Sequence, residues 1–439
     1  MVSQMQWTAK KKYKFVLIFA FLIFFLVEIF SQFTWNVVGD DQVYFYMGNQ
    51  VAEGKLPYKD FFYAHPPLQL LVYGFLFKLI PYSHTFRVFF ILLTILNAYL
   101  LYSIAKREFS EKVALLSAII YLYTPTILFN ASFEYGLTIG MTFFLLGLKW
   151  FKVWSVQVLM FLLASFYRFH FIFLIVGYYV YFLFSRDKEI IKQYLFRLGI
   201  WLTLFLLVNI NLMIYLPNYL EDVFLYHYLK PELSIQSFLI ISTILKINYL
   251  LFILPLIFLL FYLKKNNQVI ALYLLIPIPF LMYFTFNTFF GYYFVILVPF
   301  LSVVSGYTIG KIGNKWIYIP LVFFIIISSI NYTTSIIYIH NIDIYNKEII
   351  GDPPMAAYLA LNQNNTIVGG DIDHNSMRYE QNVGNLTQLF YNIKNKHPFV
   401  VVKKDEGLYA RNQEFKTWLG VSCILSEVIQ GGEYLVFKC

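Results

Sequence analysis

The sequence predicts a polytopic α-helical membrane protein followed by a small polar domain. Of its 439 residues, 59% are hydrophobic and 13% are charged, whereas soluble domains have about 45–50% apolar and about 25% charged residues. Apolar runs of membrane-spanning length recur up to residue 338, and from about residue 340 the chain is polar and rich in turn residues. We therefore expect a transmembrane region over 1–339 and a separate domain over 340–439.

Apolar runs of about 17–25 residues mark the predicted spans. There are about eleven, at 15–36, 87–105, 113–130, 135–151, 153–167, 168–185, 198–216, 247–263, 268–287, 292–310 and 316–338. The first run follows a basic N-terminus but is too long for a signal peptide, so we read it as a span. The pair 153–167 and 168–185 is short, and its members meet at a sharp turn.

Lysine and arginine in the loops predict the orientation of these spans. With a cytoplasmic N-terminus, the inside segments carry 17 of these residues, and the outside segments before the C-terminal domain carry 7. The prediction is a multi-pass protein of the cell membrane with its N-terminus inside and its C-terminal domain outside. The net charge of +9 fits cytoplasmic anchoring, and we find no nucleic-acid-binding motif.

The first outer loop, 37–86, contains two helix-like stretches. One is DQVYFYMGNQVAEG, and the other is PPLQLLVYGFLFKLI, which begins with Pro66 and Pro67. Proline suits the first position of a helix. Since the second stretch is too short to span a membrane, we expect both to lie at the membrane interface.

Two adjacent acids, Asp40 and Asp41, stand at the start of this loop after Gly39. One interpretation is helix capping, because acids near a helix start are favoured by the helix dipole. The other is a general base, because a carboxylate against an aromatic wall can have a raised pKa. Asp40 and Tyr44 would share one helix face. The residues alone leave both interpretations open.

Other polar residues are predicted at the same outer membrane level. His65 precedes Pro66 in the first loop, and Glu134 lies in the short second outer loop, 131–136. Arg168 lies between two short spans, where an ionisable residue is a functional candidate by default; the alternative interpretation is snorkelling. The remaining outer polar residues, which interfacial placement alone would also explain, are His227, Lys230 and Tyr293.

The C-terminal segment is predicted to form a small α/β domain. NTIVGG, PFVVVKK and EYLVFKC have the pattern of short strands, and MAAYLALN and LTQLFYNIK that of helices. The chain has two cysteines, Cys423 and Cys439, both in this domain. They form a disulfide if the domain lies in an oxidising compartment, and two free cysteines are an equally good interpretation.

The first outer loop resembles that of the GT-C class of membrane glycosyltransferases, which includes the protein O-mannosyltransferases and the aminoarabinose transferases of lipid A. The similarity rests on an ordered set of motifs: the acid pair Asp40–Asp41, Tyr44, the Gly-x-x-Pro-Tyr stretch that ends at Tyr58, and Pro66-Pro67-Leu68. The match is good over this loop and looser over the remaining spans and the C-terminal domain.

This resemblance implies a hexosyl- or pentosyltransferase that uses a sugar carried on a polyprenyl or dolichyl phosphate. It implies an inverting single displacement with Asp40 as general base, supported by Asp41, and Glu134 falls where the family places another catalytic acid, in the second outer loop. The predicted substrate or lipid-phosphate binders are His65, Arg168, Tyr293, Tyr58, His227 and Lys230. Of these, the resemblance itself assigns Arg168 and Tyr293 to the phosphate. His65 stands where the aminoarabinose transferases have a lysine before Pro-Pro.

The implied partners are the lipid-linked donor, an acceptor protein, lipid or glycan, and membrane lipids. No cofactor is required by the motifs; a divalent metal on Asp40 and Asp41 is one option. Two other classes of function compete with this prediction. A transporter or flippase of lipid-linked sugars would place its charges near mid-membrane, and a non-catalytic membrane subunit would use the outer domain to bind a partner.

Overall fold

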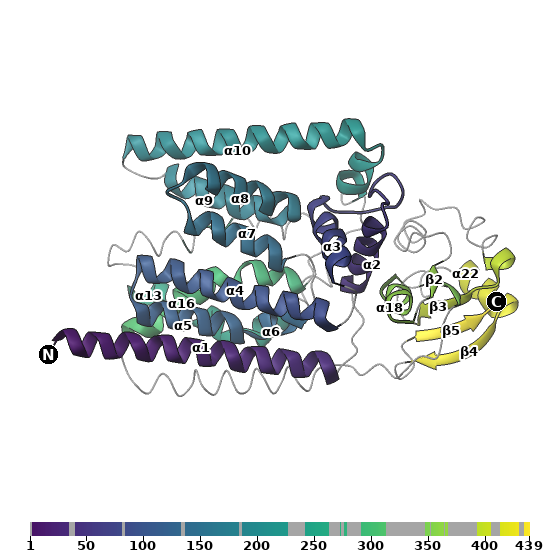
Figure 1. Cartoon of the computed structure of the whole chain (residues 1–439), viewed down its shortest axis with the longest axis horizontal. Helices are drawn as coiled ribbons and strands as arrows, with labels where there is room; N and C mark the ends of the chain where they lie inside the picture. Colours follow the sequence, from purple (N-terminus) through teal and green to yellow (C-terminus); the bar gives the residue numbers. More distant parts are fainter. Residues whose placement is uncertain are drawn as a thin grey trace. The chain divides into compact units, whose positions relative to one another are not determined.

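The computed structural model of the chain is shown in Figure 1. It describes residues 2–34, 40–80, 84–132, 137–183, 187–226, 242–262, 273, 276–278, 291–312, 347–351, 353–363, 365–367, 393–404, 413–429 and 434–439. The chain forms two compact units. The first contains residues 1–32, 87–211 and 231–335, and the second contains residues 33–86, 212–230 and 336–439.

The first unit is built from apolar helices that run in roughly the same direction (Figure 1). The described helices that lie wholly or mostly in it are α1 (Val2–Thr34), α4 (His84–Glu108), α5 (Glu111–Tyr123), α6 (Pro125–Ser132), α7 (Thr138–Lys149), α8 (Trp154–Tyr167), α9 (His170–Leu183), α10 (Lys188–Tyr215), α13 (Tyr249–Tyr262) and α16 (Val298–Ile312), with a 3-10 turn η2 (Gly291–Ile296) before α16. Helices α5 and α16 pack so closely that a Cβ at Gly306 would lie 2.8 Å from the backbone nitrogen of Ser117. Small residues allow such close helix packing in membranes.

Helices lie at the predicted spans wherever the structure describes them, while 316–338 lies outside the described residues and 268–287 lies largely outside them. Within the described part of the chain, 3 helices are long and apolar enough to cross a membrane, or up to 4 if a bent pair counts as one span. The prediction of about eleven spans is therefore confirmed only in part. The shorter apolar helices, such as α7, α8 and α9, have fewer than the ~20 residues that a span requires.

The bent pair is α5 and α6, which meet at an angle of 61° where a continuous span over 113–130 was predicted. Pro125 explains the bend, because proline has no N–H and its ring clashes with the preceding helical turn. Helix α5 ends at Tyr123, and Thr124 adopts an extended conformation.

The second unit contains the two helices predicted in the first loop: α2 (Asp40–Ala52) and α3 (Leu68–Leu79). They pack so tightly that a Cβ added at Gly48 would lie 2.5 Å from the Tyr73 Cβ. Helix α18 (Pro353–Gln363), from the C-terminal segment, also contacts α2. The short π-helical turn η1 (Glu221–Leu225) belongs to the same unit. The interfacial position of α2 and α3 stays a prediction.

The C-terminal segment forms a five-stranded sheet in the order β2-β1-β3-β5-β4. The strands are β1 (Glu348–Gly351), β2 (Thr366–Ile367), β3 (Phe399–Lys403), β4 (Ile424–Ile429) and β5 (Tyr434–Lys438), and α22 (Gln413–Ser422) precedes β4. Strand β1 pairs in parallel with β2 and β3, whereas β5 pairs antiparallel with β3 and β4. This mixed sheet fits the predicted small α/β domain.

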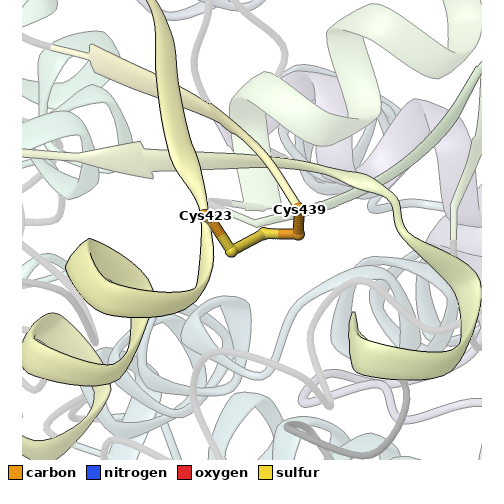
Figure 2. The surroundings of a disulfide bond; sticks show 2 residues. All are labelled: Cys423 and Cys439. Atoms are coloured by element: carbon orange, nitrogen blue, oxygen red, sulfur yellow. A yellow bond between two sulfur atoms is a disulfide. The ribbon is translucent and has the colours of Figure 1, made fainter.

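Cys423 and Cys439 form a disulfide, 16 residues apart in the sequence (Figure 2). Cys423 follows α22, and Cys439 follows the last strand, β5. The structure thereby favours the paired state over the two free cysteines that the sequence left equally open. The bond joins the end of β5 to the residue after α22, a helix whose Phe415 and Leu419 pack in one hydrophobic cluster with Val400 and Val402 of β3.

Candidate active site

Helix α2 begins with the acid pair, and Asp40 and Asp41 both lie in its first turn. This position is compatible with the capping and with the general-base interpretation. Acids in the first turn of a helix are stabilised by the N-terminal end of its dipole. The two acids differ in their surroundings: Asp40 is partly exposed, whereas Asp41 is fully buried and accepts a hydrogen bond of 3.2 Å from Gln42 Nε2. Asp40 is therefore the more accessible of the two acids, and Asp41 lies in the interior.

Tyr44 lies one helical turn after Asp40, on the same face of α2. Its hydroxyl is 3.2 Å from His65 Nε2, and the two rings meet edge to face with centroids 5.8 Å apart. The loop after α2 thus returns to place His65 against the helix that carries the acid pair. Since both His65 and Tyr44 are partly exposed, this pair offers an accessible polar surface.

The loop between α2 and α3 is held by its own tyrosines. The hydroxyl of Tyr58 donates a hydrogen bond to the backbone carbonyl of His65. Tyr63 packs edge to face against both His65 and Tyr44, and its hydroxyl donates to Gln69 Oε1 at 2.7 Å. Tyr58 and Tyr63 are almost fully buried, so in this structure they contact His65 from the interior of the protein. The predicted substrate-binding role of Tyr58 stays a prediction.

A second group of predicted residues lies in the first unit, where α8 ends and α9 begins. Arg168 is extended between these helices, with φ −153° and ψ 131°, and its side chain is 2% exposed. His170 begins α9, and its ring centroid lies 4.2 Å from that of Tyr293 in η2. The fold thus brings Tyr293 to the helix junction that holds Arg168.

Three predicted residues, Glu134, His227 and Lys230, lie outside the described residues. Their predicted roles, like those of the other site residues, stay predictions. Within the described part of the chain, no group of three or more His, Cys, Asp or Glu side chains could hold a metal ion. A metal on Asp40 and Asp41 alone stays a prediction.

Two buried acids were missed by the sequence analysis. Glu28 in α1 and Asp222 in η1 are 0% and 1% exposed. The signal for Glu28 is a lone acid inside an apolar run, which is costly in a membrane and typical of a functional residue. Asp222 gave no comparable signal, because an acid in a polar outer loop is usually solvated.

The arrangement around α2 can carry out general-base chemistry. An accessible carboxylate can take a proton from a hydroxyl group that approaches it. A neighbouring histidine and tyrosine can donate hydrogen bonds to oxygen atoms of a ligand. In the first unit, a buried guanidinium such as that of Arg168 is well suited to an anionic group, because charge-assisted hydrogen bonds are stronger than neutral ones.

No protein-family model and no curated protein matches the sequence. Solved structures with the same fold do match. The apo structure of ArnT, an aminoarabinose transferase from Cupriavidus metallidurans, has a TM-score of 0.63 at 13% identity and covers 98% of both chains. ArnT bound to undecaprenyl phosphate has a TM-score of 0.60 at 13% identity, covering 96% of this chain and 97% of ArnT.

A second similar protein is the oligosaccharyltransferase AglB from Archaeoglobus fulgidus, in complex with an inhibitory peptide and a dolichol-phosphate. Its TM-score is 0.55 at 9% identity, over 91% of this chain and 70% of AglB. ArnT and AglB are both GT-C glycosyltransferases. At these identities the likeness is one of fold, and it confirms the resemblance inferred from the first loop: this chain has the fold of the GT-C membrane glycosyltransferases.

Proposed function

We propose that this protein is an integral-membrane glycosyltransferase that moves a sugar from a polyprenyl or dolichyl phosphate to an acceptor hydroxyl. The observation that carries the proposal is the partly exposed Asp40 at the start of α2, beside the Tyr44–His65 pair, in a chain with the GT-C fold. The two proteins of this fold described above were solved with undecaprenyl phosphate and with a dolichol-phosphate. A lipid phosphate donor is therefore the substrate class that the fold favours.

The proposed reaction is an inverting single displacement. The acceptor hydroxyl attacks the anomeric carbon of the sugar, and the bond between that carbon and the phosphate oxygen breaks. The acceptor proton passes to the Asp40 carboxylate, and the lipid phosphate leaves with the bonding electron pair. General-base assistance of this kind contributes roughly 10²–10⁴-fold to a rate.

Other residues are proposed, from the resemblance of the first loop, to act on the lipid phosphate. The positive charge of Arg168 binds the phosphate of the lipid donor through charge-assisted hydrogen bonds. His65 donates a hydrogen bond and adds charge only when it is protonated, which distinguishes it from a lysine. Tyr293 contributes a hydroxyl group to the same phosphate.

We also propose that the reaction and the C-terminal sheet lie on the extracytoplasmic side. The supporting observations are the distribution of Lys and Arg in the loops and the Cys423–Cys439 disulfide, because disulfides persist in oxidising compartments. In intact cells, a membrane-impermeant maleimide should label these cysteines only after treatment with a membrane-impermeant reductant. Labelling that requires permeabilised cells would contradict this orientation.

Buried Glu28 is the observation that favours the alternative of a transporter or flippase, because α1 is one of the candidate spans. The test separates the two functions. Purified protein in proteoliposomes is given a panel of polyprenyl-phosphate monosaccharides with a labelled sugar, together with candidate acceptors. Glycosyl transfer releases free polyprenyl phosphate and moves the label to an acceptor. Translocation of intact donor with no cleavage would support the transporter and overturn the enzyme.

A further inference from the structure

The segment that follows α10 holds the loop between α2 and α3 in place. The segment is 219–226, which includes η1, and the loop is 56–65. Both belong to the second unit. The contacts come from residues three and four positions apart, which is the spacing of one helical face: Tyr219, Asp222 and Tyr226.

Asp222 makes the polar contact. Its side chain is 1% exposed, and Oδ2 accepts a hydrogen bond of 3.4 Å from the backbone N–H of Tyr63, 159 positions earlier. A buried carboxylate is costly unless hydrogen bonds compensate it, so its presence here indicates a specific task. Asp222 also lies in a π-helical turn, and such turns occur frequently at functional sites.

Two ring contacts flank this hydrogen bond. Tyr219 meets Tyr58 edge to face with centroids 5.0 Å apart, and Tyr226 meets Phe62 at the same centroid distance. Burial raises the pKa of the Tyr219 hydroxyl above its ordinary value, which keeps the ring neutral. Segment 219–226 thus contacts the loop at three residues, Tyr58, Phe62 and Tyr63.

The loop that is held contains a strained residue. Tyr58 has φ +66°, in the left-handed region that non-glycine residues rarely adopt. Such a conformation is strained and persists only where the surrounding structure enforces it. Its hydroxyl bonds to the His65 carbonyl, so the backbone of Tyr58 and the position of His65 are coupled.

We propose that Asp222 is a positioning residue that fixes loop 56–65, and through it the Tyr44–His65 pair beside Asp40. The link runs from the Asp222 carboxylate to the Tyr63 amide, and from the Tyr63 ring to His65 and Tyr44. The catalytic consequence rests on the proposed function. The structural consequence, an ordered loop 56–65, is independent of the proposed function.

The test compares Asp222→Ala with Asp222→Asn and uses Glu221→Ala as the matched control, because Glu221 is an exposed acid in the same turn. Hydrogen exchange of the full-length protein in detergent or nanodiscs reports on the amides of loop 56–65. Loss of a hydrogen bond to a charged group should speed their exchange about 10–100-fold in Asp222→Ala. Asp222→Asn keeps an acceptor oxygen and should fall between Asp222→Ala and the wild type.

Wild-type exchange of the loop in Asp222→Ala would overturn the proposal, and so would an equal increase of exchange in the C-terminal sheet, since that indicates general unfolding. Sugar transfer is the second measurement: kcat should fall in Asp222→Ala, recover in Asp222→Asn and stay unchanged in Glu221→Ala. An ordered Asp222→Ala loop together with a normal kcat rejects the positioning role. Absence of transfer in the wild type rejects only the proposed function and leaves the exchange result decisive for the loop.

Discussion

The two groups of candidate residues differ in how the chain brings them together. Tyr44 and His65 are 21 positions apart and belong to one helix and the loop that returns to it. His170 and Tyr293 come from α9 and η2, which are distant in the sequence, and only the fold of the first unit joins them. The difference shows that a local motif can be read from sequence, whereas a site assembled from distant helices requires the packing.

The two groups also differ in exposure. Asp40, Tyr44 and His65 are partly exposed, which the proposed proton transfer from the acceptor requires of Asp40. Arg168, His170 and Tyr293 are 2%, 7% and 4% exposed, which suits a charge held in a low-dielectric environment. We therefore expect substitutions in the first group to act on the rate, and substitutions in the second group to act on donor binding.

The largest expected effect separates Asp40 from Asp41. Asp40→Asn should lower kcat by about 10²–10⁴-fold with an unchanged melting temperature, because it removes the accessible base. Asp41→Asn changes a fully buried side chain that contacts Gln42. Its main effect should be a lower melting temperature, with a smaller loss of kcat per folded molecule than in Asp40→Asn. Transfer kinetics and thermal unfolding check both. A normal rate in Asp40→Asn with an inactive, fully folded Asp41→Asn would reverse the assignment.

The next effect concerns Arg168. Arg168→Gln should raise the KM for the lipid donor by a factor that corresponds to about 2–5 kcal/mol, as for loss of one partner from a buried charge pair. The control is Arg197→Gln, because Arg197 makes structural hydrogen bonds to Phe151 O and Gln157 Oε1. It should lower stability and leave KM for the donor unchanged. Equal donor KM values for Arg168→Gln and the wild type would remove Arg168 from the binding site.

A smaller effect tests the packing that places α2. Gly48→Ala should destabilise the protein by about 1–3 kcal/mol, as overpacking does, because the new methyl group would overlap the Tyr73 Cβ. Gly199→Ala is the matched control, since a Cβ there meets nothing within 4 Å. Thermal unfolding in one detergent compares the two. Equal stability would show that α2 and α3 are not packed as described.

The smallest effect concerns the Tyr44 hydroxyl. Tyr44→Phe removes its hydrogen bond to His65 and should cost about 0.5–1.5 kcal/mol in transition-state stabilisation, or roughly 2–13-fold in kcat/KM. Tyr63→Phe loses the bond to buried Gln69 and should act on stability instead. Comparison of kcat/KM with melting temperature for the two variants distinguishes these outcomes. A stability loss in Tyr44→Phe without a kinetic effect would make Tyr44 purely structural.

Much of the local structure could be predicted from the sequence. The acid pair at the start of α2, the helix after Pro66–Pro67 and the C-terminal strands all carry short-range signals. The bend at Pro125 was also encoded but was overlooked, because an apolar run over 113–130 resembles one span. Periodicity and hydropathy report on length and polarity, and a proline within the run should have divided it.

The rest depended on contacts between distant residues. The sequence could not distinguish Asp40 from Asp41 by exposure, because that depends on which face of α2 packs against α3 and α18. It could not find Asp222, whose partner is 159 positions away. The disulfide was undecided for the same reason: pairing depends on the sheet that brings α22 and β5 together.

The most direct test of the central claim is the stereochemistry of the transferred sugar. Purified protein in proteoliposomes is supplied with a lipid-phosphate sugar of known anomeric configuration, and the product linkage is determined by NMR. A single displacement assisted by Asp40 predicts a product of the opposite configuration, with one free lipid phosphate released for each sugar transferred. A product with the donor's configuration, or donor that remains uncleaved, would contradict the proposed mechanism.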